Sequence, residues 1–486
     1  MTGLAKGAKW IAASQLIKVA AQVASIFVLA RLMSPSDYGL VALVSVVTTF
    51  AMLFKDLGSS AAIIQAQKLP DSLLTTAFWL NMLLGASLTV VVSISALFAP
   101  ALFDAPLLTP ALLMLSIAFP MLSSSAVHQA LLERSQQFDI VAKAEIAAAT
   151  IGLGVAVISA YQGAGVFSVV YQTLCASAIS SVLLWRGCAW RPTSPTAWRK
   201  THLLSMLRYS SGLIGFNFVN YFARNADSVI VGRVLSTAIL GAYSLAYRIM
   251  LFPLQSLTVV VSRSLFPALA RLQSDRLGMK ATYFSSVRVV AFLVAPLMAG
   301  VYFLREPFVR LVFGEQWGLS SEILAWLAPT GFLQALMSTT GVVFMATGKT
   351  RLLFKLGIIG AVLQVGAFLL GVQHGVVVMA ACYFVSNLLN AIPVAGCCLT
   401  ELDAKPSELW ACIWRPMAGA AVMISGLAMI YGGRVGDTSL GWPGLMLMVA
   451  TGVLIHGLMV LMVDRKTAGD LLRSVVPVRF RSGAER

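Results

Sequence analysis

The sequence predicts an all-α integral membrane protein of about fourteen transmembrane helices, arranged as two parallel six-helix repeats with two extra C-terminal helices. Three observations lead to this fold class. Hydrophobic residues make up 58% of the 486 positions and charged residues only 11%, whereas ordinary soluble domains carry about 25% charged residues. Apolar segments of membrane-spanning length recur along the whole chain. A short motif near the start returns 202 positions later in similar apolar surroundings.

The apolar segments define the expected helices. About 20 apolar residues in an α-helix cross a hydrocarbon layer of roughly 30 Å. Two pairs of neighbouring segments are split only by the tripeptides that begin at Tyr161 and Gln373, so twelve to fourteen helices are expected. The first segment holds Gln15, Lys18 and Gln22, which favours a retained helix over a cleaved signal peptide. The segments are 10–31, 39–63, 75–99, 108–131, 140–161, 164–185, 209–231, 239–264, 285–304, 321–346, 353–372, 375–399, 410–431 and 442–463.

The repeated motif indicates an internal duplication. Arg31-Leu-Met-Ser34 followed by Gly39 recurs as Arg233-Val-Leu-Ser236 followed by Gly241. A unit of about six helices repeated in this way is common in transporters, and an even helix number makes the repeats parallel. The basic, proline-containing stretch 186–200 is the expected linker. The predicted domains are an N-terminal lobe with its linker (1–205), a C-terminal lobe (206–400), and two further helices with a basic tail (401–486).

The formal charge of +16 is distributed as membrane topology requires, and it does not indicate a nucleic-acid partner. With the N-terminus in the cytoplasm, 25 of the 35 Lys and Arg residues fall in inward loops and tails. Five face outward and five lie within apolar segments. This asymmetry follows the positive-inside rule and predicts that both termini are cytoplasmic.

Soluble-enzyme chemistry and cofactor binding have little support. The four histidines are scattered, and no pair has the spacing of metal ligands. The six cysteines are isolated except for Cys397 and Cys398, and a disulfide framework is not expected for thiols on membrane segments. We therefore expect no metal, no cofactor and no catalytic residue.

Charged residues inside apolar segments are the strongest candidates for function. An Asp, Lys or Arg at a helix centre costs about 2.5–3.5 kcal/mol, so it usually faces a cavity or a partner. Arg263, at the inner end of its segment, can extend its side chain out of the membrane. Without it, four such cations face two carboxylates, and this excess positive charge favours an anionic ligand. Arg224 and Asp227 are spaced i, i+3, so they could instead neutralise each other. The intramembrane charges are Lys18, Lys55, Asp56, Arg224, Asp227 and Arg248.

Amide and tyrosine side chains, including Asn220 and Tyr247, cluster beside these charges. Such groups suit a hydroxyl-rich ligand such as a sugar. They also form routine hydrogen bonds between membrane helices, and the sequence leaves both readings open. The candidate substrate-binding residues are Lys18, Asn220, Arg224, Tyr247 and Arg248, and the candidate ion-coupling residues are Asp56 and Asp227.

Several motifs resemble one transporter family. The run Tyr221-Phe-Ala-Arg-Asn-Ala-Asp-Ser-Val-Ile-Val-Gly-Arg233, the run Gly241-Ala-Tyr-Ser-Leu-Ala-Tyr-Arg248 and the segment Phe266-Pro-Ala-Leu-Ala-Arg271 are similar to the Wzx-type polysaccharide flippases of the multidrug/oligosaccharidyl-lipid/polysaccharide superfamily. Leu29 to Gly39 and Asp56-Leu-Gly58 are similar to that family's first repeat. The resemblance extends to about residue 400, and it carries over Arg224, Asp227 and Arg248 as motif members. It implies a two-lobed, V-shaped bundle.

The resemblance also implies a function. Such a protein moves undecaprenyl-diphosphate-linked oligosaccharide across the bacterial inner membrane for exopolysaccharide or lipopolysaccharide synthesis. A cationic cavity between the lobes would hold the diphosphate and would open to each side in turn. Expected partners are the lipid-linked oligosaccharide, the bilayer, an H⁺ or Na⁺ gradient, and polysaccharide polymerase and chain-length proteins. The alternatives are a drug/cation antiporter of the same superfamily and a membrane polysaccharide polymerase or ligase. The short outward loops disfavour the enzyme.

Overall fold

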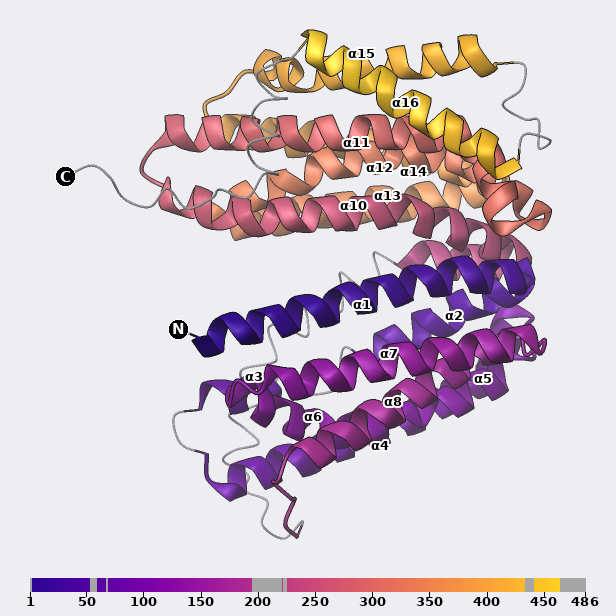
Figure 1. Ribbon diagram of the computed structural model, residues 1–486, viewed down its shortest axis with the longest axis vertical. Helices are drawn as coiled ribbons and strands as arrows, with labels where there is room; N and C mark the ends of the chain where they lie inside the picture. The colour runs from indigo at the N-terminus through magenta and orange to yellow at the C-terminus, as the bar shows by residue number, and fades with distance from the viewer. Residues whose placement is uncertain are drawn as a thin grey trace. The chain divides into compact units, whose positions relative to one another are not determined.

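The structure is a computed structural model that describes residues 2–52, 59–66, 69–194, 221, 225–432 and 441–463. The chain forms two compact units, Met1–Ser244 and Leu245–Arg486 (Figure 1). This boundary differs from the expected lobe boundary at 205. The difference arises because the helix at 225–234 and the first residues of the next helix pack against the first unit.

The first unit is a bundle of helices whose turns gather at two ends. The turns α1–α2, α4–α5 and α7–α8 lie at one end, and the turn α6–α7 lies at the other (Figure 1). Helix α1 packs along α7, α7 along α8, and α6 against both α4 and α8. The helices are α1 (Thr2–Leu32), α2 (Pro35–Met52), α3 (Ser59–Gln65), α4 (Asp71–Phe103), α5 (Leu108–Ser116), α6 (Ala118–Arg134), α7 (Phe138–Tyr161) and α8 (Phe167–Gly187).

The second unit is built around α11, which packs against α12, α15 and α16. Helix α14 packs against both α12 and α13. Helix α10 begins in the first unit and continues into the second. The helices are α10 (Thr237–Arg271), α11 (Arg276–Phe313), α12 (Gly318–Ala346), α13 (Thr350–Val372), α14 (Val376–Glu401), α15 (Pro406–Tyr431) and α16 (Gly441–Val463), with a 3₁₀ turn at Glu315–Trp317.

The expected membrane helices are largely confirmed. Among the described residues, twelve helices are long and apolar enough to cross a membrane, and α10 adds a 35-residue helix. One expected segment is interrupted within the described residues, because 108–131 is shared by α5 and α6. The segment 39–63 holds α2 and α3, and residues 53–58 between them lie outside the described residues. Most of the expected helix 209–231 lies outside the described residues, so the count of fourteen stays a prediction.

Both closely spaced helix pairs are separate, as expected. The turn between α7 and α8 contains Gly163 at φ +79°, and Gly375, at φ +102°, directly precedes α14. Glycine populates positive φ without the steric cost that a Cβ brings. These two short, tight turns therefore reverse the chain where the hydropathy profile shows only a brief dip.

The start of the inter-repeat linker is fixed to the first unit. The Trp79 indole N–H donates to the Thr193 carbonyl at 3.0 Å, and the Thr75 and Thr193 hydroxyls lie 2.9 Å apart. Cys188 is only 8% exposed and packs with Leu132 and other apolar residues. After α8, the linker thus runs along the surface of the first unit, and Cys188 is shielded from solvent.

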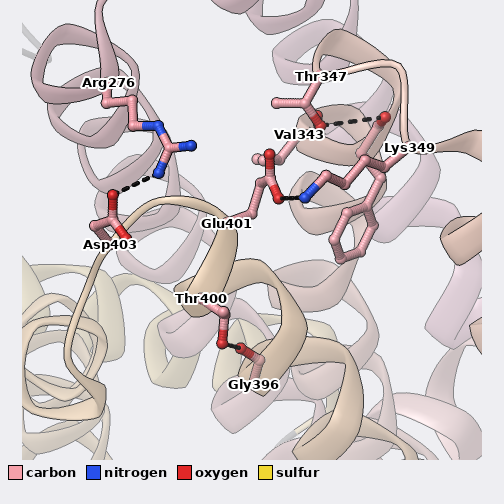
Figure 2. Close-up of polar contacts among 9 residues, drawn as sticks. Arg276, Val343, Thr347, Lys349, Gly396, Thr400, Glu401 and Asp403 are labelled. Atoms are coloured by element: carbon pink, nitrogen blue, oxygen red, sulfur yellow. Dashed lines mark hydrogen bonds and ion pairs between the residues drawn. The ribbon is translucent and has the colours of Figure 1, made fainter.

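Ion pairs join three turns at one end of the second unit. Figure 2 shows Arg276 facing Asp403 and Lys349 facing Glu401. Arg276 Nη1 lies 2.6 Å from Asp403 Oδ2, and Lys280 Nζ lies 2.8 Å from Glu408 Oε2. Because exposed pairs contribute about 0–1 kcal/mol each, this cluster orients turns more than it stabilises the fold. Its charges are mutually neutralised, which makes it a weak candidate for an anion site.

Candidate functional site

The repeated motif has a structural basis at two helix starts. Ser34 directly precedes α2 and accepts a hydrogen bond from the Asp37 N–H at 3.1 Å. Ser236 directly precedes α10 and accepts from the Ile239 N–H at 3.2 Å. In both copies the serine is an N-cap that satisfies an otherwise unpaired backbone donor. The motif therefore specifies a short turn followed by a capped helix, once in each copy.

The glycines of the two motifs meet in a reciprocal contact. A Cβ on Gly39 would lie 1.8 Å from the Thr237 carbonyl oxygen, and a Cβ on Gly241 would lie 1.9 Å from the Pro35 carbonyl oxygen. The Ser36 and Thr237 hydroxyls are 2.9 Å apart at the same place. Each glycine is the fifth residue of its helix and approaches the first residue of the other. This exchange is the pattern of a local two-fold axis.

Asp227 is buried and links two helices of the first unit. It is 3% exposed, and its carboxylate accepts from the Tyr243 hydroxyl at 2.8 Å and from the Ser228 N–H at 2.7 Å. Nearby, the Tyr221 hydroxyl donates to the Val46 carbonyl of α2. The hydrogen bond between Asp227 and Tyr243 joins the helix at 225–234 to α10, so this carboxylate has a structural role.

Lys18 forms an ion pair with a residue that the sequence analysis did not select. Its Nζ lies 2.9 Å from Oε1 of Glu145 on α7. Glu145 falls within the apolar segment 140–161, and it was omitted from the count of intramembrane carboxylates. The only signal was a single acidic residue in an apolar run. The charge of Lys18 is therefore already compensated within the first unit.

The remaining candidate residues are only partly described. Tyr247 and Arg248 are half-buried on α10, in the part of that helix that belongs to the second unit. Asp56, Asn220 and Arg224 lie outside the described residues. Among the described residues, no group of three His, Cys, Asp or Glu side chains could hold a metal ion.

The second unit contains a polar cluster that sequence reasoning also missed. The Gln334 amide on α12 donates to the Tyr383 hydroxyl at 2.7 Å and to the Asn387 side-chain oxygen at 3.1 Å, both on α14. Asn387 in turn donates to the Tyr383 carbonyl at 2.8 Å. Because these side chains satisfy one another across two apolar helices, their main effect is to fix the α12–α14 contact.

Known proteins share this sequence pattern. The profile of a family described as polysaccharide biosynthesis protein matches residues 28–322. The lipopolysaccharide biosynthesis protein WzxC of Escherichia coli K12 is 26% identical over 389 residues, which cover 79% of each chain. The succinoglycan biosynthesis transport protein ExoT of Rhizobium meliloti is 25% identical over 451 residues, covering 92% of this chain and 90% of its own.

Solved transporter structures share the fold. The lipid II flippase MurJ, in an inward closed conformation, gives a TM-score of 0.73 at 14% identity and covers 95% of this chain and 99% of its own. An inward-facing multidrug transporter of the MATE family gives 0.60 at 15% identity, covering 79% of this chain and 94% of its own. At this level of identity the likeness concerns the fold alone.

Proposed function

Because the chain belongs to the polysaccharide biosynthesis protein family, we propose that it is a flippase that moves lipid-linked oligosaccharide across the bacterial inner membrane. The observation that carries the proposal is the similarity over most of the chain to WzxC and ExoT. The substrate would be an undecaprenyl-diphosphate-linked repeat unit for exopolysaccharide or lipopolysaccharide synthesis.

The chemistry of the chain supports this substrate. A diphosphate cannot cross hydrocarbon without compensating charge, and Lys18 and Arg248 lie within apolar helices. Such cations, with tyrosine and amide side chains nearby, suit an anionic group that carries sugars. Transport would proceed by alternating access.

Ion coupling and protein partners are further parts of the proposal. Two carboxylates are candidates for coupling transport to an H⁺ or Na⁺ gradient. Asp227 is buried in the first unit, and Asp56 lies outside the described residues. Polysaccharide polymerase and chain-length proteins would act on the translocated product. A drug/cation antiporter is the alternative function, and likeness to the MATE fold is its support. A polymerase or ligase is disfavoured, because the relative ExoT is a transport protein.

Deletion of the gene should remove surface polysaccharide and leave lipid-linked oligosaccharide on the inner leaflet. A plasmid copy should restore export. Arg248→Ala should leave the amount of inserted protein near normal but fail to restore export, since a cation is lost from the binding path. Arg351→Ala, at an exposed position near the start of α13, is the matched control and should restore export. Normal polysaccharide in the deletion strain would contradict the proposal.

The proposed topology places both termini and the linker in the cytoplasm. In a variant whose six native cysteines are replaced by serine, Ser194→Cys should react with an impermeant maleimide only after the inner membrane is permeabilised. Gln162→Cys, in the α7–α8 turn, should react from the periplasmic side. Native Cys188 is unsuited to this experiment because it is buried. The reverse labelling pattern would invert the topology.

A further inference from the structure

The ion pair between Lys18 and Glu145 joins α1 and α7, two apolar helices of membrane-spanning length. At roughly 1.5 Å per residue, Lys18 is about 14 Å beyond Lys9, where the apolar part of α1 begins. By the same measure Glu145 is about 10 Å beyond Phe138, the first residue of α7. Helix α1 lies beside α7 (Figure 1). Both residues therefore lie within apolar helices that are long enough to cross a hydrocarbon layer of roughly 30 Å.

The pair is only partly buried. The Lys18 side chain is 37% exposed and that of Glu145 is 29% exposed. An ammonium group has three donors, and the contact with Glu145 Oε1 accounts for one. A ligand that reached this surface could therefore contact the ammonium without first unfolding the α1–α7 interface.

The exposed surface of α1 has two chemically different faces. Gln15 and Gln22 are exposed and flank Lys18 on one face, which also carries Ile11 at 48% exposed. Leu16, at 71% exposed, and Phe27, at 37%, lie on another. At about 100° per residue, the centres of the two faces are roughly 140° apart. Lipid suits the apolar face, whereas an ion pair and amides within a membrane helix usually face a cavity or the interior of the protein.

We propose that Glu145 is the resting counter-ion of Lys18, and that the diphosphate of the lipid-linked substrate displaces it during transport. This inference rests on the proposed function. A diphosphate carries more charge and more acceptor oxygens than one carboxylate, so it can take over the ammonium. When the substrate leaves, Glu145 returns. The positive charge of Lys18 is thus compensated both with and without substrate. Competition from Glu145 keeps substrate binding weak enough for release.

The exchange predicts opposite effects for the two partners. Glu145→Gln removes the competitor, so undecaprenyl diphosphate should bind about tenfold more tightly, the size of one charge-assisted hydrogen bond. Translocation should then slow, because release is impeded. Lys18→Gln should weaken binding by a similar factor, and the double variant should behave like Lys18→Gln. Native mass spectrometry of the purified full-length protein measures these affinities, and thermal unfolding monitors the fold.

Matched controls separate exchange from a structural role. Asp139→Asn breaks the exposed Asp139–Lys143 pair on the same helix and should leave binding unchanged. If both Lys18→Gln and Glu145→Gln weaken binding, or if neither alters it, the pair is only structural and the inference is wrong. If Glu145→Gln tightened the binding of cardiolipin as much as that of undecaprenyl diphosphate, the pair would bind phospholipid head groups. The inference would then also be wrong. Failure of the wild-type protein to bind undecaprenyl diphosphate more tightly than undecaprenol would instead contradict the proposed function.

Discussion

Replacing Gly241 or Gly39 with alanine should prevent the protein from accumulating in the membrane. The added Cβ would lie 1.9 Å or 1.8 Å from a backbone carbonyl oxygen, and neither obstacle is a flexible side chain. The capped starts of α2 and α10 would have to separate. We expect a destabilisation of about 3 kcal/mol or more, at the upper end of overpacking effects. Membrane protein yield and thermal unfolding of any purified variant are the measurements.

Gly154→Ala in α7 is the matched control, because no heavy atom lies within 4 Å of its added Cβ. Alanine is favoured over glycine in a helix interior by about 0.5–1 kcal/mol, so this variant should melt at the wild-type temperature or slightly above. If Gly241→Ala accumulated and melted like Gly154→Ala, the reciprocal glycine contact would not exist in the folded protein.

Asp227→Asn should fold but fail to transport. Asparagine keeps an oxygen that can accept from the Tyr243 hydroxyl, so the link between the helix at 225–234 and α10 should survive. Loss of the ionisable group should reduce translocation at least about tenfold if this carboxylate couples transport to an ion gradient. Thermal unfolding and export of surface polysaccharide, measured on the same variant, distinguish the two effects.

Two further variants test the structural side of Asp227. Asp227→Leu removes the acceptor for Tyr243, which is 1% exposed, and should cost about 1–3 kcal/mol of stability. Tyr243→Phe removes the donor and should destabilise the protein less, because the phenyl ring keeps its packing. If Asp227→Asn exported polysaccharide as well as the wild-type protein does, Asp227 would have only a structural role. Another group would then couple transport to the ion gradient.

Helix positions were predictable because hydropathy alone determines which segments cross a membrane. The turns at Gly163 and Gly375 were visible as brief polar interruptions. The break between α5 and α6 was not visible, since an apolar run stays apolar whether or not the helix within it ends. Hydrophobicity fixes burial in lipid, but local backbone geometry is set by neighbouring helices.

The partners of the candidate residues could not be predicted. Lys18 was selected as an intramembrane cation, but its pairing with Glu145 depends on the packing of α1 beside α7, helices separated by more than a hundred residues. The hydrogen bond from Tyr243 to Asp227 likewise requires the close approach of two helices. In the sequence, Ser34 and Ser236 were recognisable only as matching residues of a repeat. The structure explains the match, because each serine caps the start of a helix.

Reconstitution of the purified protein into vesicles tests the central claim most directly. Fluorescently labelled undecaprenyl-diphosphate-linked oligosaccharide is placed in both leaflets, and a membrane-impermeant quencher is added outside. We expect the protected fraction to disappear in vesicles that contain the wild-type protein, and to persist in protein-free vesicles and in those with Arg248→Ala. Protection that persists with the correctly folded wild-type protein, under both H⁺ and Na⁺ gradients, would contradict its assignment as a flippase.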